Sequence, residues 1–156
     1  MSAGETMKRQ PGFTLIELMV TIVVAVILAT VAVPGFQRIM ATNRIAADYN
    51  EALSGLNFAR SEAIKRRVED TFEVSGESPW SYEVTVDGTL LRSRSGRDGR
   101  TGLELEENVD DVVFGPLGRP VEDCSDGCVV TLVSNMSGAD NREIIISTMG
   151  RVSRAP

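Results

Sequence analysis

The sequence predicts an α+β protein in which one long N-terminal helix packs its C-terminal half on an antiparallel β-sheet. An uncharged, apolar run over residues 18–33 leads into a stretch whose apolar residues recur every three or four positions. After Arg67 that period disappears, and short runs of alternating apolar and polar residues take its place. A chain of 156 residues should carry one globular domain.

The apolar half of the helix has the length of a membrane span. Residues 13–33 would form roughly 31 Å of helix, about the thickness of a bilayer core. Lys8 and Arg9 precede it, and positive charge before an apolar helix retains the N-terminus in the cytoplasm and exports the chain beyond the helix. A cleaved secretory signal is disfavoured because the apolar run is not succeeded by a small-residue A-x-A site. A plain single-pass anchor does not explain Glu17, whose lone carboxylate is costly in hydrocarbon.

The second half of the helix is predicted over about residues 36–67. Its apolar positions recur at spacings of three and four, as in an amphipathic helix, at Ile45, Tyr49, Leu53, Leu56, Ala59 and Ala63. The basic run Lys65-Arg66-Arg67 closes the segment, and cations in a last turn complement the helix dipole.

Short strands are predicted after the helix, and we expect them to form an antiparallel sheet. The run 82–86 and the run 89–92 flank Asp87-Gly88, a strong signal for a two-residue hairpin turn. Further strands are expected at residues 102–109, 111–115, 129–133 and 143–148. Residues 92–100 carry four arginines among glycine and serine, which favours a flexible, solvated loop over a binding site.

The composition limits the possible functions. Histidine is absent, which removes the commonest general base and the commonest metal ligand. The formal net charge is −6, so nucleic-acid binding would need a local basic patch. Adjacent acids such as Glu106-Glu107 and Asp110-Asp111 are typical of solvated surface. We therefore expect no catalytic residue, no metal, no cofactor and no enzymatic activity.

Cys124 and Cys128 are separated by three residues and precede the strand expected at 129–133. In a cytosolic protein such a pair could be redox-active, whereas in an exported domain it is typical of a small structural disulfide. Because export is predicted here, we expect a disulfide that fixes a tight turn. Without histidine or further cysteines, a metal site is disfavoured.

The N-terminus resembles the class III signal of type IV prepilins, through the string Gly12-Phe13-Thr14-Leu15-Ile16-Glu17. The resemblance implies that a prepilin peptidase cuts between Gly12 and Phe13 and methylates Phe13 as the new terminus. It also implies that Glu17 neutralises the terminal ammonium of a neighbouring subunit in the filament core. An ion pair in low dielectric is strong, and either charge alone is disfavoured, so this pair would set subunit register.

Three later segments resemble the GspH/FimT family of type IV minor pilins and pseudopilins, at residues 57–66, 113–119 and 144–152. The run 59–63 and Pro34 look more like the FimT/FimU pilus branch than the GspH secretion branch. The resemblance implies a pilin fold in four parts. These are a leader peptide, a transmembrane or filament-core helix, its amphipathic continuation and a β-rich periplasmic domain, at residues 1–12, 13–34, 35–67 and 68–156.

The family implies a structural subunit that helps initiate or cap a type IV pilus. Its partners would be the prepilin peptidase, other minor and major pilins, and the inner-membrane assembly platform. The precursor would sit in the inner membrane with a cytoplasmic N-terminus and a periplasmic domain, and later in the pilus or pseudopilus. One alternative is a GspH-like pseudopilin of type II secretion.

The other alternative is a DNA-binding minor pilin for natural transformation. FimT-like proteins end in a glycine-arginine-any-arginine tail, and Gly150-Arg151-Val152-Ser153-Arg154 resembles it, with the second arginine one position late. Arg151 and Arg154 could reach phosphates from a mobile tail without reading sequence. Because Arg151 also fits the general family pattern, DNA is not the favoured partner.

Overall fold

The computed structural model describes residues 12–75 and 79–155. It begins with one long helix, α1 (Leu15–Arg66), followed by short β-strands and a single 3₁₀ turn. The chain forms two compact units that divide between Gln37 and Arg38, within α1, and each is described by itself. The strands are β1 (Asp70–Ser75), β2 (Ser81–Val86), β3 (Thr89–Ser95), β4 (Thr101–Leu105), β5 (Asp111–Phe114), β6 (Pro120–Val121), β7 (Cys128–Ser134), β8 (Arg142–Ile146) and β9 (Val152–Arg154), with η1 (Glu122–Cys124) before β7.

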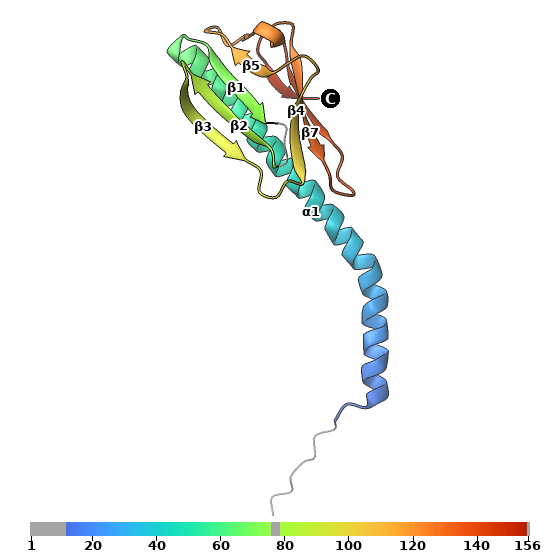
Figure 1. Cartoon of the computed structure of the whole chain (residues 1–156). Coiled ribbons are helices and arrows are strands. Elements are labelled where there is room, and N and C mark those ends of the chain that lie inside the picture. Colours follow the sequence, from blue (N-terminus) through green and yellow to red (C-terminus); the bar gives the residue numbers. More distant parts are fainter. Residues whose placement is uncertain (1–11, 76–78, 156) are drawn as a thin grey trace, which may run out of the picture. The chain divides into compact units, whose positions relative to one another are not determined.

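The strands of the second unit form two antiparallel sheets (Figure 1). The first sheet has the order β3-β2-β1-β5-β6 and the second the order β4-β7-β8-β9. The predicted α+β class, with a helix on antiparallel sheet, is confirmed. The expectation of one sheet is wrong, because β4 pairs with β7 while β5, the next strand, returns to β1. Periodicity identifies a strand but says nothing about its partner.

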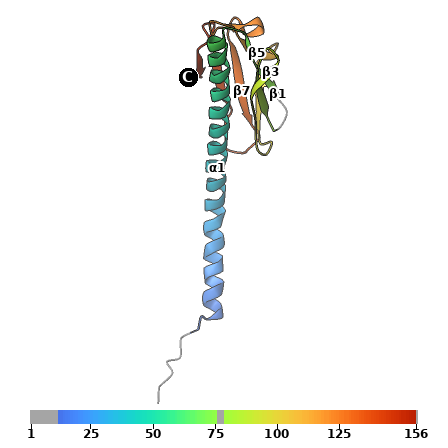
Figure 2. The same cartoon turned by 90° about the vertical axis from the view of Figure 1, so that its left-hand side faces the viewer.

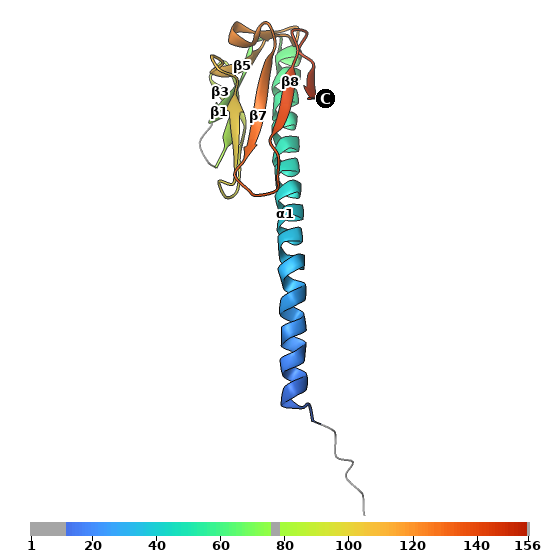
Figure 3. The ribbon, with the colours of Figure 1, turned by 90° about the vertical axis from the view of Figure 1, so that its right-hand side faces the viewer.

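One hydrophobic core lies between both sheets and the C-terminal half of α1. Figure 2 shows β7 alongside this half of the helix, and Figure 3 shows both β7 and β8 there. The helix contributes small and large side chains, among them Ile45, Ala52 and Leu56. Gly55 faces the first sheet so closely that a Cβ there would lie 2.6 Å from the Tyr82 ring. The predicted apolar stripe is therefore the face that the sheets cover.

The predicted hairpin is confirmed, since β2 and β3 pair around Asp87 and Gly88. Both turn residues have positive φ, 46° and 72°, as a two-residue hairpin turn of type I′ requires.

The ends of two other elements differ from the predictions. β4 ends at Leu105 rather than 109, because residues 106–109 turn back, with the Val109 amide donating to the Glu106 carbonyl. The helix ends at Arg66, and Arg67 adopts the left-handed conformation of a helix stop, with φ 58°.

The arginine-rich segment 92–100 is not simply a flexible loop, and that prediction is wrong for its first half. Arg92 and Arg94 belong to β3, where Arg92 lies opposite Val84 of β2. The Arg92 guanidinium donates to a Glu51 carboxylate oxygen of α1 at 2.7 Å, and the Tyr82 hydroxyl donates to the same oxygen at 2.9 Å. Burial opposes ionisation of Glu51, but these hydrogen bonds and the nearby arginine charges outweigh it and lower the pKa of this carboxyl.

Candidate functional site

The first candidate site is the start of α1, where Thr14 caps the helix. The Glu17 amide donates to the Thr14 hydroxyl at 3.2 Å, and the Leu18 amide donates to the Thr14 carbonyl at 3.2 Å. Threonine at the cap with glutamate three residues later is the pattern of a capping box. Phe13, which precedes the cap, is 88% exposed. The structure therefore places Gly12 and Phe13 outside the helix, with Glu17 in its first turn.

Beyond the cap, α1 presents an apolar surface that nothing in the first unit covers. All residues 12–37 are exposed, and large aliphatic side chains such as Leu18, Ile22 and Leu28 recur around the helix. By length and composition α1 can cross a membrane. The two hydroxyls in this stretch are internally bonded, since Thr21 donates to the Leu18 carbonyl at 2.8 Å and Thr30 to the Ile27 carbonyl at 2.7 Å. This surface suits lipid or other apolar helices.

Glu17 is the one acidic side chain on this surface in the described part of the first unit. No cation of the described chain lies within ion-pair distance of its carboxylate. Its position also suits the helix itself, because a negative charge in the first turn complements the helix dipole. Glu17 can therefore serve the helix end and still face a charge from outside the chain.

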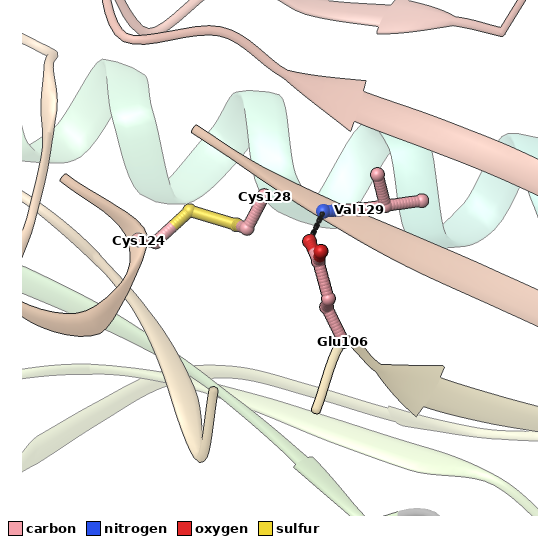
Figure 4. The surroundings of a disulfide bond; sticks show 4 residues. All are labelled: Glu106, Cys124, Cys128 and Val129. Atoms are coloured by element: carbon pink, nitrogen blue, oxygen red, sulfur yellow. Dashed lines mark hydrogen bonds between the residues drawn. A yellow bond between two sulfur atoms is a disulfide. The ribbon is translucent and has the colours of Figure 1, made fainter. Parts of the chain in front are cut away.

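The disulfide expected from the sequence is present and joins Cys124 to Cys128, with Cα atoms 5.2 Å apart. Both cysteines are buried in the core, and Figure 4 shows the bridge between η1 and the start of β7. The turn needs Gly127, whose φ is 91° and whose Cβ would lie 2.8 Å from the Ile146 carbonyl oxygen. Beside the bridge, the Val129 amide donates to the Glu106 carboxylate at 3.2 Å (Figure 4).

The two arginines considered for DNA contact lie in a turn and in a strand. Arg151 lies in the turn between β8 and β9, where its amide donates to the Ser147 hydroxyl at 3.1 Å. Arg154 lies in β9, opposite Ile144, so the C-terminal segment is an ordered strand through this residue. Arg154 lines one pocket together with Arg142, and the Arg142 guanidinium lies over the Tyr49 ring, 5.9 Å from its centroid. Burial raises the pKa of the Tyr49 hydroxyl, and the charges of Arg154 and Arg142 partly offset that rise.

Sequence reasoning missed a buried acid. Asp70, the first residue of β1, is fully buried, and neither oxygen of its carboxylate has a hydrogen-bond partner. Burial, together with the negative charge of Glu62, raises its pKa from 3.8 to about 7, although Arg66 opposes the rise. No three potential metal-ligating side chains come together within residues 12–75 and 79–155. The alternating pattern of Phe72 and Val74 was the available signal for this strand.

Comparisons with known proteins match almost the whole chain. Residues 7–33 match the model of the prokaryotic N-terminal methylation motif, and residues 48–150 match the model of type II transport protein GspH. The order of the two matches, methylation motif and then GspH domain, defines a subunit of the type IV pilin class.

One curated relative and two solved structures indicate which branch of the pilin class this chain resembles. A fimbrial protein of Pseudomonas aeruginosa is 30% identical over 140 residues, which cover 88% of each chain. Two crystal forms of the type IV minor pilin FimU from the same organism share the fold. The first has a TM-score of 0.60 at 21% identity, covering 73% of this chain and 90% of FimU, and the second a TM-score of 0.55 at 20%, covering 69% and 89%. The chain belongs to the GspH/FimT family of type IV minor pilins.

Proposed function

We propose that this minor pilin is cut between Gly12 and Phe13, methylated at Phe13 and inserted into a type IV pilus, whose assembly it helps initiate or cap. The observation that carries the proposal is the capped, uncovered apolar helix that begins directly after the cleavage position. A protease needs an extended substrate, and Gly12 and Phe13 precede the first helical turn. The exposed helix surface gives the mature subunit its means of entering an apolar filament core.

Glu17 is proposed to pair with the Phe13 ammonium of a neighbouring subunit. Cleavage creates that ammonium next to the positive end of a helix dipole, where a cation is unfavourable. A carboxylate from an adjacent subunit removes this penalty, and in low dielectric it also fixes the axial register of the two helices. Glu17 would become the fifth residue of the mature chain.

The proposed segments, localisation and partners of the protein all follow from cleavage at Gly12 and assembly into a pilus. Residues 1–12 are the leader, 13–34 the membrane and filament-core helix, 35–67 its amphipathic continuation and 68–156 the periplasmic domain. The N-terminus would stay cytoplasmic until cleavage, and the domain would fold where disulfides form, which suits the Cys124–Cys128 bridge. Prepilin peptidase, other pilins and the inner-membrane assembly platform are the proposed partners.

Maturation is tested by the intact mass of the protein extracted from membranes of the producing organism. Wild type should lose residues 1–12 and gain one methyl group, and Gly12→Val should retain the full precursor mass. Gly35→Val is the matched control, since a Cβ at either glycine meets nothing within 4 Å. If Gly12→Val still yields the normal mature mass, the prepilin assignment is wrong.

Type II secretion is the second candidate function. Residues 48–150 match the model of type II transport protein GspH, and this match favours secretion. The fimbrial protein of Pseudomonas aeruginosa, in contrast, favours the pilus. Deletion of the gene separates the two candidates. Loss of surface pili with normal protein secretion supports the pilus, and the reverse outcome supports the secretion pseudopilus.

DNA uptake is a third candidate, supported by Arg142 and Arg154, which line one pocket together. Phosphate contacts by these side chains would make duplex binding salt-sensitive. Binding of a DNA duplex to the purified protein should then fall with Arg154→Gln and with added salt. Equal binding by the variant and the wild type would remove the argument.

A further inference from the structure

Two turns and the last part of α1 meet at a pair of glycines. A Cβ on Gly150, in the turn after β8, would overlap the Gly118 carbonyl oxygen in the turn between β5 and β6. A Cβ on Gly118 would lie 2.6 Å from the Ile64 side chain of α1. The same Gly118 carbonyl accepts a hydrogen bond from the Arg60 guanidinium at 3.0 Å. Backbone contact and this hydrogen bond therefore hold the three elements together.

Three large apolar side chains project from this junction into solvent. Leu117 is 79% exposed, Met149 is 62% exposed and Ile64 is 46% exposed. Leu117 directly precedes Gly118, and Met149 directly precedes Gly150. Ile64 of α1 packs on Gly118. Scattered exposed apolar residues are ordinary, but three gathered at one rigid junction form a patch of the kind that binds other proteins.

Arginines border the same junction. Arg60 bonds Gly118, Arg119 is the next residue after Gly118, and Arg151 is the next after Gly150. Among the described residues, no carboxylate forms an ion pair with any of these three arginines. They stand out in a protein whose net charge is −6. Together, Ile64, Leu117 and Met149 with Arg60, Arg119 and Arg151 make up the junction patch.

We propose that the junction patch docks a neighbouring pilin subunit through a surface that carries carboxylates around an apolar centre. The proposal rests on the proposed function, because it names a contact that the assembled subunit makes. An apolar centre with an arginine border is the usual composition of a protein interface, in which arginine is enriched. Guanidiniums that have no ion-pair partner select carboxylates, since the two groups match in charge and in planar geometry.

The chain itself displays the complementary chemistry. An acidic apolar groove of about 390 Å³ is lined by Val74, Leu105, Val109, Leu103, Glu104 and Asp110. A subunit of the same fold can therefore present carboxylates beside aliphatic side chains. The apolar centre disfavours nucleic acid, because phosphate contacts gain nothing from three exposed aliphatic side chains and the overall negative charge repels DNA.

The junction patch is also preorganised. The glycine contact fixes both turns in the free protein, so docking orders little additional chain, which lowers the entropic cost of binding. The entropic cost that remains is that of ordering the exposed side chains of the patch.

The test is photo-crosslinking of the full-length protein in the organism that produces it. Benzoylphenylalanine replaces Leu117 in one strain and Leu90 in another, because Leu90 is 53% exposed on β3 and lies outside the patch. We expect an ultraviolet-dependent adduct from position 117, whose partner has a prepilin-type N-terminus and is crosslinked at a peptide containing Asp or Glu. Arg119→Glu should reduce this adduct several-fold, whereas Arg97→Glu, an equal change of charge on the β3–β4 loop, should leave it unchanged.

Three results would overturn the proposal: an adduct with DNA or lipid, no adduct from position 117, or an adduct whose yield is the same with Arg119→Glu. The mature mass of the protein and the number of surface pili are measured in the same strains. Failure of maturation would count against the proposed function, whereas normal maturation and piliation without the adduct would count against the docking surface alone.

Discussion

Gly150 presses against the carbonyl of Gly118 so closely that neither turn can accept a side chain at the contact. Both residues also have positive φ, 76° and 70°, a conformation that glycine adopts freely. The contact joins turns that are far apart in the chain, and through Arg60 it joins both to α1. This contact therefore links the C-terminal end of the helix to turns that belong to both sheets.

Gly150→Ala should destabilise the protein far more than Gly88→Ala. Both residues have similar positive φ, but a Cβ at Gly88 meets nothing within 4 Å, so that variant isolates the backbone cost of about 1 kcal/mol. At Gly150 overlap with the Gly118 carbonyl adds to this cost, for a total of at least about 3 kcal/mol. Urea unfolding in a mild detergent measures both values through Trp80, the one tryptophan, which is buried. An equal loss of unfolding free energy in the two variants would show that the turns at Gly118 and Gly150 move apart at little cost.

Asp70→Asn should stabilise the protein at pH 8 and flatten the dependence of its stability on pH. The folded-state pKa of Asp70 is raised from 3.8 to about 7, so the folded protein holds a proton that the unfolded chain releases. Stability should therefore fall as pH rises from about 4 to about 7, by roughly 4 kcal/mol in total for this group. Urea unfolding of the wild type and of Asp70→Asn at several pH values measures this change in the free energy of unfolding.

Asp87→Asn is the control for this prediction. Asp87 lies in the exposed β2–β3 turn, and asparagine tolerates its positive φ of 46°. This variant should show the wild-type pH profile, because it leaves Asp70 and the neighbouring charges of Glu62 and Arg66 unchanged. If Asp70→Asn also shows the wild-type profile, the buried carboxyl is not the group that titrates.

Replacing Cys124 and Cys128 together by alanine should cost about 2 kcal/mol from lost loop constraint, with a further loss from the vacated core. The cost is modest because the bridge closes a very short loop. Reductant should lower the unfolding midpoint of the wild type and leave that of the double variant unchanged. A wild type that is insensitive to reductant even when unfolded would show that the bridge does not form in the cell.

Glu17→Gln should permit maturation and reduce incorporation into pili at least several-fold, because glutamine carries no charge to pair with a Phe13 ammonium. Thr14→Val serves as its counterpart, since it removes the hydroxyl that caps the helix and keeps the carboxylate. The measured quantity is the fraction of mature protein in sheared pili relative to membranes. Incorporation that falls with Thr14→Val and stays normal with Glu17→Gln would contradict the subunit pairing and show that the helix cap is what incorporation needs.

Features encoded by neighbouring residues were predictable from the sequence. The start of α1, its apolar half and the Asp87-Gly88 hairpin each depend on contacts within a few positions, so local patterns identify them. The contact of Arg92 with Glu51 was not predicted, because Glu51 lies 41 positions away and nothing local indicates the pairing.

The features that distinguish this domain depend on tertiary structure. The contact between Gly118 and Gly150 requires knowing which turns adjoin, and glycine in a turn is expected whether or not anything packs on it. Asp70 looks like an ordinary polar residue after a helix, and only the pairing of β1 with both β2 and β5 buries it. The junction patch likewise draws on three separate segments of the chain.

The role in pilus assembly is tested most directly by the number of surface pili on cells of the source organism after clean deletion of the gene. We expect that pili disappear, that they return when the wild-type gene is restored, and that they do not return with Gly12→Val. Normal piliation in the deletion strain would contradict the role in pilus assembly.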